Sequence, residues 1–297
     1  MCAKSVIAIL VIPILCSAKI KIDIKTDSIH EDIRIKVSGH DNKLVTDKEI
    51  ALFNITKDNL LQGIRVELGR SPKDVFLKDP TPYKNLFKRY KWEEVRRHLK
   101  VTKTKVLQVV NEYAVLNVHE HINTASSSIN YTAAVFQTVE NTILSFWSKY
   151  GLPEDDIFYD IGVSFYNKIF NYENKWRNDS IRTVNSAFGI KKEGFAEIMP
   201  GQTILSKLTG LKTIILIEIE YTAKLIGNII ADYEALYGKY HFYSPTIAKI
   251  MKAANLLNEA KTTEWIEIRC YTEPELRIIY KDTGLDVPFY YPRKFYV

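Results

Sequence analysis

The sequence predicts a mainly β protein (β-rich α+β), in which an elongated module of long strands carries a smaller mixed lobe with two or three helices. The first observation is that apolar and polar residues alternate along several segments. This pattern predicts strands, because the side chains of a strand point to opposite faces with a period of two. Strand length is the second, since residues 130–147 and 213–225 alternate over stretches longer than the usual five or so residues. Strands of this length are typical of an elongated sheet rather than a compact sandwich.

The first eighteen residues predict a secretory signal peptide that is cleaved after Ala18. Lys4 precedes the apolar run at residues 6–15, and Cys16-Ser17-Ala18 supplies small residues at the cleavage site. The apolar run is too short for a membrane-spanning helix, which takes about 20 residues. The alternative is a buried N-terminal strand. The signal peptide predicts an extracellular protein whose mature chain begins at Lys19.

Short strands open the mature chain. Residues 19–27 alternate strictly, residues 33–37 repeat the pattern after a turn, and residues 48–53 are predicted as a third strand. We assign them to the mixed lobe, which is predicted to comprise residues 19–110 together with residues 227–297.

Three segments of this lobe predict helices. Thr56 is a natural cap for a short helix that ends near Ile64. Apolar residues recur at helical spacing over residues 86–99. In the third segment Ser244 is predicted as the N-cap and Pro245 as the first helical residue.

The predicted β module spans residues 111–226 and includes an amphipathic hairpin at residues 160–190, with a polar turn at 171–179. The valine-rich residues 106–118 are predicted to form a long strand at the start of this module. The strand at 213–225 is predicted to be central to the sheet. Its even-numbered residues Glu218, Glu220 and Lys224 should face solvent, and its odd-numbered face should be buried: Ile215, Ile217, Ile219 and Tyr221.

Cysteines and sequons agree with secretion. Cys2 and Cys16 leave with the signal peptide, so Cys270 is the one cysteine of the mature chain; it is either buried and inert or paired between chains. Candidate glycosylation sites occur at Asn54, Asn130 and Asn178, each in an Asn-x-Ser/Thr triplet.

The sequence contains no motif that indicates an enzyme, a cofactor or a metal site. His119 and His121 lie on one strand face without a third ligand, so a solvated strand is favoured over metal binding. Asp282-Thr283-Gly284 occurs once, whereas an aspartic peptidase needs two aspartates. Residues 154–156 are predicted as a solvated acidic turn rather than a calcium site. The formal net charge of +6 is spread along the chain, which argues against a nucleic-acid partner.

The order of the predicted elements resembles that of the aerolysin-like β-pore-forming proteins. A long strand is followed by an amphipathic hairpin, then by Pro200-Gly201-Gln202-Thr203 and the strand at 213–225. Four shorter blocks resemble the spherulin-2A family, which includes insect follicular-epithelium yolk proteins: residues 50–56, 71–76, 90–95 and 241–245. The resemblance covers nearly the whole mature chain. It implies a secreted, non-enzymatic protein with an aerolysin-like fold.

Three functions remain open at this level. The first is an egg or yolk storage or structural protein made by follicle cells and located in yolk or eggshell. The second is a pore-forming toxin or defence protein that forms a homo-oligomer on a membrane. The third is a carbohydrate- or surface-binding module, in which exposed aromatic residues stack on sugars or partners: Tyr237, Tyr240, Phe242, Tyr243 and residues 289–292.

Overall fold

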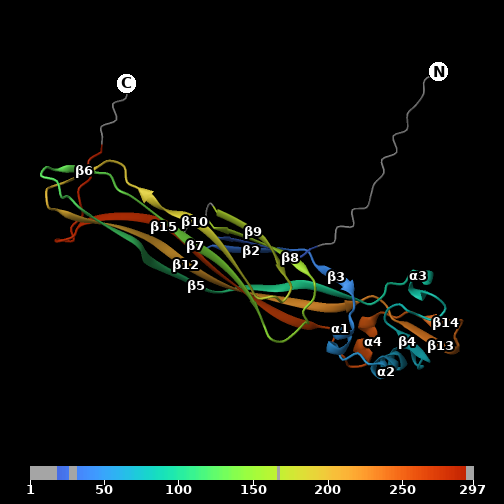
Figure 1. Cartoon of the computed structure of the whole chain (residues 1–297). Coiled ribbons are helices and arrows are strands. Elements are labelled where there is room, and N and C mark those ends of the chain that lie inside the picture. The colour runs from blue at the N-terminus through green and yellow to red at the C-terminus, as the bar shows by residue number, and fades with distance from the viewer. Residues whose placement is uncertain (1–18, 27–31, 166–167, 292–297) are drawn as a thin grey trace, which may run out of the picture.

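The computed structural model describes residues 19–26, 32–165 and 168–291 of the 297-residue chain. The predicted signal peptide, residues 1–18, lies outside the described residues. The described chain is elongated: long strands run along its length and the helices gather at one end (Figure 1). The predicted mainly β fold, with an elongated β module and a smaller mixed lobe, is confirmed.

A six-stranded sheet, called the long sheet below, forms the body of the molecule. Its strand order is β10-β7-β15-β12-β5-β3, and every neighbouring pair is antiparallel. The strands are β3 (Asp41–Leu44), β5 (Arg96–Ile122), β7 (Ala134–Trp147), β10 (Ser180–Lys191), β12 (Thr203–Ile226) and β15 (Ala260–Tyr280). Strands β5, β12 and β15 each have more than 20 residues, and these lengths give the molecule its elongated shape.

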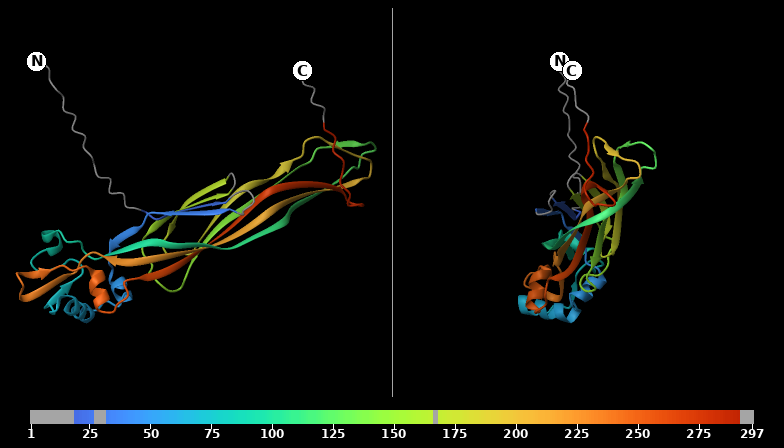
Figure 2. Two further views of the ribbon diagram at one scale, coloured as in Figure 1. Left: turned by 180° about the vertical axis from the view of Figure 1, so that it is seen from behind. Right: turned by 90° about the vertical axis from the view of Figure 1, so that its left-hand side faces the viewer.

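A smaller four-stranded sheet, called the short sheet below, has the order β2-β1-β8-β9 and lies alongside the middle of the long sheet (Figure 2). It contains β1 (Lys21–Thr26), β2 (Ile33–Ser38), β8 (Phe158–Phe165) and β9 (Lys168–Lys175). Strands β1 and β8 are parallel, and the other two pairs are antiparallel. The sequence predicts β1 and β2 as part of the mixed lobe, but β1 pairs with β8 and β2 pairs with β1, so both strands lie on the β module. Whether the two predicted units fold as independent domains stays a prediction.

The lobe at the helical end contains a three-stranded sheet and short helices. The sheet has the order β14-β13-β4, with β4 (Asp74–Phe76), β13 (Ile230–Tyr237) and β14 (Tyr240–Tyr243). The helices of the described chain are α1 (Asp47–Leu52), α2 (Lys57–Leu68), α3 (Leu86–Tyr90) and α4 (Ile247–Ala253). At the opposite end of the molecule β6 (Ile129–Tyr131) pairs with β11 (Ala196–Ile198).

Local capping explains where helix prediction was right and where it was wrong. Thr56 caps α2 as predicted. The strand predicted at residues 48–53 is instead α1, because Thr46 and Glu49 form a capping box in which the Thr46 side chain accepts from Glu49 N and the Glu49 carboxylate accepts from Thr46 N.

The other two predicted helices are shorter than expected. The helix predicted at 86–99 ends at Tyr90, because Lys91 adopts the left-handed conformation (φ 58°). The chain then enters β5 at Arg96. The N-cap position of the last helix is Thr246, whose side chain makes no capping hydrogen bond, and not Ser244, so Pro245 precedes the helix.

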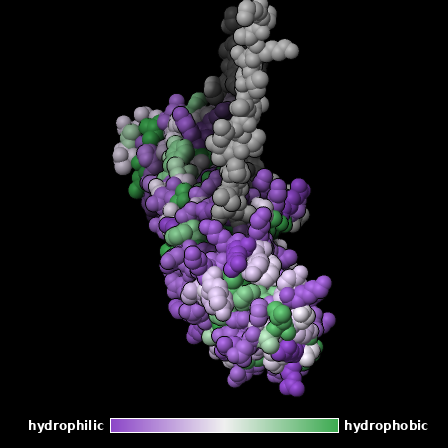
Figure 3. Space-filling view, turned by 90° about the vertical axis from the view of Figure 1, so that its right-hand side faces the viewer, coloured by the Kyte–Doolittle hydropathy of each residue, from purple (hydrophilic) through white to green (hydrophobic). Residues whose placement is uncertain are grey.

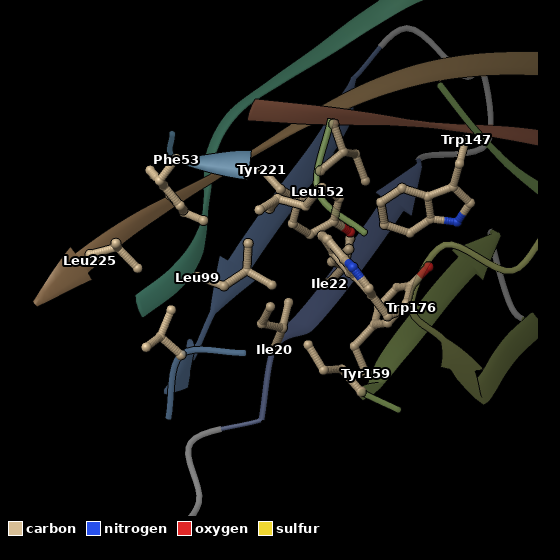
Figure 4. Packing of buried hydrophobic residues seen from close by; sticks show 14 of the residues in the cluster. Ile20, Ile22, Phe53, Leu99, Trp147, Leu152, Tyr159, Trp176, Tyr221 and Leu225 are labelled. Carbon is tan, nitrogen blue, oxygen red and sulfur yellow. The ribbon is translucent and has the colours of Figure 1, made fainter. Parts of the chain in front are cut away.

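The main core lies between the two sheets and continues into the lobe. Figure 4 shows Ile20 and Ile22 from the short-sheet side near Leu99 of the long sheet. The expected burial of β12 is confirmed, since its odd-numbered residues from Ile215 to Tyr221 are fully buried. On the other face Lys224 is exposed, whereas Glu218 and Glu220 are half-buried, because β12 has a neighbouring strand on each side.

A buried arginine joins β5 to the segments around it. The Arg97 guanidinium lies 2.6 Å from Asp41 on β3, 3.0 Å from Glu49 on α1 and 3.3 Å from Asp155 before β8. Removing one partner of such a buried cluster leaves uncompensated charge and typically costs about 3–5 kcal/mol. Arg97 therefore fixes the boundary between the lobe and the β module.

Strand β12 provides a direct stability test. Ile217→Asp places an unpaired carboxylate in the core and should lower the free energy of unfolding by several kcal/mol, enough to prevent recovery of folded protein. Glu220→Lys loses a 3.2 Å ion pair with the half-exposed Lys261 and should cost at most about 1 kcal/mol. Urea denaturation and the yield of folded protein measure both effects. Equal yields of the two variants would contradict this orientation of β12.

Candidate functional site

A hairpin inserted between two paired strands is the most unusual feature of the β module. Strands β7 and β10 pair directly, from Ser145–Ser180 to Ala134–Lys191, yet the chain between them does not turn back at once. Residues 148–179 leave the long sheet, form the hairpin β8–β9 within the short sheet and then return. An insert of this kind can detach without breaking the β7–β10 pairing.

The prediction of one hairpin at residues 160–190 is correct in its amphipathic character but wrong in its connectivity. Most of the polar turn predicted at 171–179 is strand β9, and the change of direction into β10 occurs after Lys175. Strand β10 belongs to the long sheet. The sequence could not show this, because a strand on either sheet alternates in the same way.

The two faces of the hairpin differ in polarity. On the inner face Tyr159, Ile161, Val163 and Phe165 of β8 are buried. They pair with the inner residues of β9, which are Lys168, Phe170, Tyr172 and Asn174, so polar residues interrupt this apolar face at both ends of β9. The outer face is mainly polar, with Phe158 and Ile169 as exposed apolar exceptions; its other residues are Asp160, Gly162, Ser164, Asn171, Glu173 and Lys175.

The length of this pattern matches a membrane-crossing hairpin. Each strand has 8 residues, and Trp176 N donates to Ile157 O at 2.7 Å, which extends the ladder by one pair. Ile157 and Trp176 are both buried, so they extend the apolar face as well. A transmembrane strand takes about 9–11 residues and alternates between lipid-facing apolar and polar side chains.

Aromatic rings hold the inner face against the long sheet. Trp176 lies between Trp147 of β7 and Tyr221 of β12, with ring centroids 4.5 Å and 4.8 Å away, and Figure 4 shows the three residues together with Tyr159. Edge-to-face aromatic pairs add about 0.5–1.5 kcal/mol each beyond the area that they bury. The hairpin is therefore docked mainly by apolar burial.

A buried carboxylate lies at the centre of this interface. Glu264 of β15 is fully buried and accepts three hydroxyl hydrogen bonds of 2.5 Å, from Ser145 of β7, Tyr159 of β8 and Tyr221 of β12. Asn174 of β9 donates to the Tyr159 hydroxyl at 2.8 Å. This network links both strands of the hairpin to three strands of the long sheet.

Burial raises the pKa of Glu264 to about 7, although the three hydroxyl donors act in the opposite direction. No cation forms an ion pair with Glu264 among the residues that the structure describes. Burial, followed by the Glu264 charge, also raises the pKa values of Tyr159 and Tyr221 well above their usual range. The surface of the long sheet that the hairpin covers thus contains a carboxyl group whose pKa burial raises to about 7.

The outer face of the hairpin is tethered more weakly. Lys19 forms ion pairs with Asp160 of β8 at 2.8 Å and with Glu173 of β9. These side chains are about a third to a half exposed, and exposed pairs contribute roughly 0–1 kcal/mol. The β1–β8 ladder and the buried inner face therefore determine whether the hairpin stays docked.

The candidate glycosylation sites all lie on the surface. Asn54, Asn130 and Asn178 are exposed, as glycosylation requires, and their occupancy stays a prediction. Asn178 lies in the turn between β9 and β10, at the base of the hairpin. A glycan there is at the opposite end of β9 from the β8–β9 connection.

The remaining residues singled out from the sequence do not join the site. Cys270 is buried in β15, and burial raises its thiol pKa to about 12, which favours the inert alternative over pairing between chains. His119 and His121 lie on β5, and the described residues contain no group of three side chains suited to a metal. The absence of enzymatic activity stays a prediction.

The sequence analysis missed Glu264, although the alternation contains its signal. Glu264 has the same parity as Ile266, Ile268 and Cys270, the buried face of β15. A glutamate in that position predicts a buried carboxylate. Its partners come from three other strands, so only the fold reveals the network.

No helix of the described chain combines the length and the apolar character needed to cross a membrane.

Comparison with known proteins supports an aerolysin-like toxin fold. No family model matches the chain. U-megalopygitoxin(8)-Mo12 of Megalopyge opercularis is 25% identical over 253 residues, covering 84% of this chain and 88% of the toxin. U-megalopygitoxin(8)-Mc8 of Megalopyge crispata is 24% identical with the same coverage.

Among solved structures, the parasporin-2 toxin of Bacillus thuringiensis, described as recognizing cancer cells, superposes with a TM-score of 0.60 at 8% identity. The match covers 80% of this chain and 97% of the toxin. The aerolysin-like fold expected from the sequence is confirmed. The narrower resemblance to the spherulin-2A family receives no support from these matches.

The pH dependence of stability tests the Glu264 network. The pKa of Glu264 is about 7 in the folded state, against 4.5 for an unperturbed glutamate. Protonation therefore stabilises the fold fully below about pH 4.5, and that stabilisation is lost as the pH rises through about 7. A shift of this size corresponds to about 3 kcal/mol. Relative to Glu264→Gln, the wild type should lose about that much unfolding free energy between pH ~4.5 and pH ~8.

Urea denaturation at several pH values measures this difference. Glu275→Gln is the matched control, because Glu275 is exposed on the same strand, and its difference from the wild type should stay constant with pH. A constant difference for Glu264→Gln as well would show that Glu264 does not titrate in this range.

Proposed function

We propose that this protein is secreted and acts as a pore-forming toxin-like protein, which oligomerises on a membrane and inserts the hairpin β8–β9. The observation that carries the proposal is the two-faced hairpin, inserted between the paired strands β7 and β10. Its inner face is mainly apolar over the length of a membrane-crossing strand, with Lys168 and Asn174 as polar exceptions, and its outer face is mainly polar.

Detachment of the hairpin converts a docked element into a membrane-crossing one. Strand β8 follows β7 in the chain and β9 leads into β10, so release from β1 leaves one long hairpin that is already paired at its base. The apolar face then leaves its contacts with the long sheet and makes contacts with lipid instead. One hairpin has two open edges, which cannot remain unpaired in a bilayer, so insertion requires several copies side by side.

The relatives support the same proposal. Two proteins similar over most of the chain are named toxins, and the parasporin-2 toxin has a similar fold, with a TM-score of 0.60. We extend the toxin activity of these proteins to this chain, with a secreted location, a homo-oligomer and a membrane as partners, and neither enzymatic activity nor nucleic-acid binding.

The storage hypothesis is the second candidate, and it was the first choice from the sequence. It depends on the resemblance of four short blocks to the spherulin-2A family, and the relatives found are named toxins instead. Accumulation of the mature protein in yolk or eggshell, without membrane activity, would favour storage over the toxin proposal.

A disulfide across β1 and β8 tests hairpin release. Lys25 and Ser164 are partners on these parallel strands, and both lie on the face opposite the core. Neighbouring strands are about 4.8 Å apart, within the range that a disulfide bridges. The double variant Lys25→Cys with Ser164→Cys should lose dye release from liposomes when oxidised and regain it after reduction.

The matched control ties β1 to β2 instead. Lys25→Cys with Arg34→Cys joins partners that do not include the hairpin, so oxidation should leave dye release unchanged. The buried Cys270 should not compete in either variant. Full leakage from the oxidised Lys25–Ser164 variant, or no leakage by the wild type on any membrane tested, would overturn the proposal.

A further inference from the structure

Two adjoining hollows on the lobe share a wall of aromatic residues. The first has a volume of about 500 Å³ and the second about 450 Å³. Tyr90 of α3 and His241 and Phe242 of β14 line both hollows. We call the two hollows together the lobe cleft. Figure 3 shows the lobe from its free end, where pale and hydrophobic patches interrupt a mostly hydrophilic surface.

The rings of the lobe cleft form a continuous aromatic surface. Tyr90 and Trp92 are stacked with centroids 4.7 Å apart. Phe242 contacts Tyr83 at 5.9 Å and Tyr90 at 6.3 Å. Tyr83 is 70% exposed and Tyr240 is 63% exposed, so the rings are available to a ligand. Aromatic residues gathered on a surface in this way indicate a binding site more than a core.

A polar atom in the first hollow lacks a partner. Ser244 lines this hollow, and its Oγ is buried with no hydrogen-bond partner among the described residues. A buried hydroxyl without a partner typically costs about 1–3 kcal/mol. Because this oxygen is shielded from solvent, a ligand hydroxyl group bonds to it only after the Ser244 side chain turns toward the hollow.

The charges around the cleft limit the class of ligand. Lys239 lines the first hollow, and no carboxylate lines it in the described chain. Aromatic pockets also bind quaternary ammonium groups, but the Lys239 ammonium opposes a cationic ligand. The second hollow has both signs, with Lys73 and Arg89 near Asp232 and Glu234, which gives donors and acceptors for hydroxyl groups.

We propose that the lobe cleft binds a saccharide. The apolar C–H face of a pyranose ring lies against the aromatic surface, and its hydroxyl groups bond to Ser244, Lys239 and the charged residues of the second hollow. Pockets of about 300–1,000 Å³ with aromatic walls and a few polar groups are typical small-molecule sites. Of the aromatic residues expected on the surface from the sequence, Tyr240, Phe242 and Tyr243 line the cleft. Tyr237 donates its hydroxyl to a backbone carbonyl instead, and Phe289 is partly buried against the core at the far end.

The position of the cleft suits the attachment of the protein to a glycan-bearing surface. The lobe occupies one end of the molecule, and β8–β9 lies along its middle (Figure 1). A glycan bound at the lobe therefore leaves the hairpin uncovered. The targeting role depends on the proposed pore-forming function, whereas saccharide binding itself does not.

Titration of the full-length mature protein with defined sugars tests the proposal. The probes are the methyl glycosides of glucose, galactose, mannose and N-acetylglucosamine, together with N-acetylneuraminic acid and phosphocholine. Binding is followed by tryptophan fluorescence, to which Trp92 contributes from the cleft, and by calorimetry. At least one saccharide should bind, and phosphocholine should bind at least tenfold more weakly. Tighter binding of N-acetylneuraminic acid than of the neutral glycosides would indicate that Lys239 pairs with the carboxylate of the sugar.

Matched variants locate the site. Tyr240→Ala removes an exposed ring and should raise the saccharide Kd at least tenfold, whereas Tyr240→Phe keeps the ring and should stay within about threefold of the wild type. Tyr150→Ala is the control, because Tyr150 is 85% exposed and belongs to neither hollow. No saccharide binding by the wild type, preferential binding of phosphocholine, or wild-type affinity of Tyr240→Ala would overturn the proposal.

Dye release from vesicles of phospholipid alone separates the two proposals. Leakage without saccharide binding would remove the lobe cleft as a saccharide site and leave pore formation standing. Saccharide binding without leakage from any vesicle, glycolipid-bearing ones included, would leave the cleft and remove pore formation.

Discussion

The inner face of the hairpin β8–β9 packs against the middle of the long sheet, where Trp176 contacts Trp147 and Tyr221 at 4.5 Å and 4.8 Å. The rest of the β module is arranged around this contact. It removes a row of apolar side chains from water, and each buried side chain of that size contributes about 1.5–3 kcal/mol. The same apolar side chains are shielded from water equally well by lipid chains and by the protein core. One sequence pattern therefore serves both a docked and a proposed inserted state.

Glu264 makes this interface unlike an ordinary apolar core. Glu264 has three hydroxyl donors and, within the described part of the chain, no cationic partner. Such a buried carboxylate is costly, because its charged form is taken out of water. In return, the network accepts only one arrangement of Ser145, Tyr159 and Tyr221. It thereby fixes the position of β8 against β7 and β12, which apolar contacts alone specify less strictly.

The two ends of the molecule have different characters. The lobe combines short helices, a small sheet and a cleft lined by aromatic rings, and the Arg97 cluster attaches it to β3, β5 and the segment before β8. The β module is simpler, and its three longest strands form a continuous antiparallel core of the long sheet. The cleft at one end and the hairpin in the middle lie apart on the same long strands (Figure 1), which is the arrangement that the two proposals require.

Local patterns in the sequence determined much of this structure. The alternation over residues 213–225 gave both the strand and its buried face, because side-chain direction in a strand depends only on parity. The Thr56 cap also followed from local chemistry. Local patterns failed at residues 48–53 and 86–99, where a capping box and a left-handed Lys91 decided the outcome. These features involve single backbone conformations, which periodicity does not report.

Only the tertiary structure decided how the strands combine. Amphipathic strands such as β8, β9 and β10 look alike in sequence, and which sheet each joins depends on partners far along the chain. The parallel pairing of β1 with β8 joins residues 21–26 to residues 160–165, and the Glu264 network unites side chains from β7, β8, β12 and β15. The sequence alone determined the period of alternation and the amphipathic character of these strands, but not the bounds of the hairpin. Its docking, and the buried charge beneath it, arise from long-range contacts that no local pattern encodes.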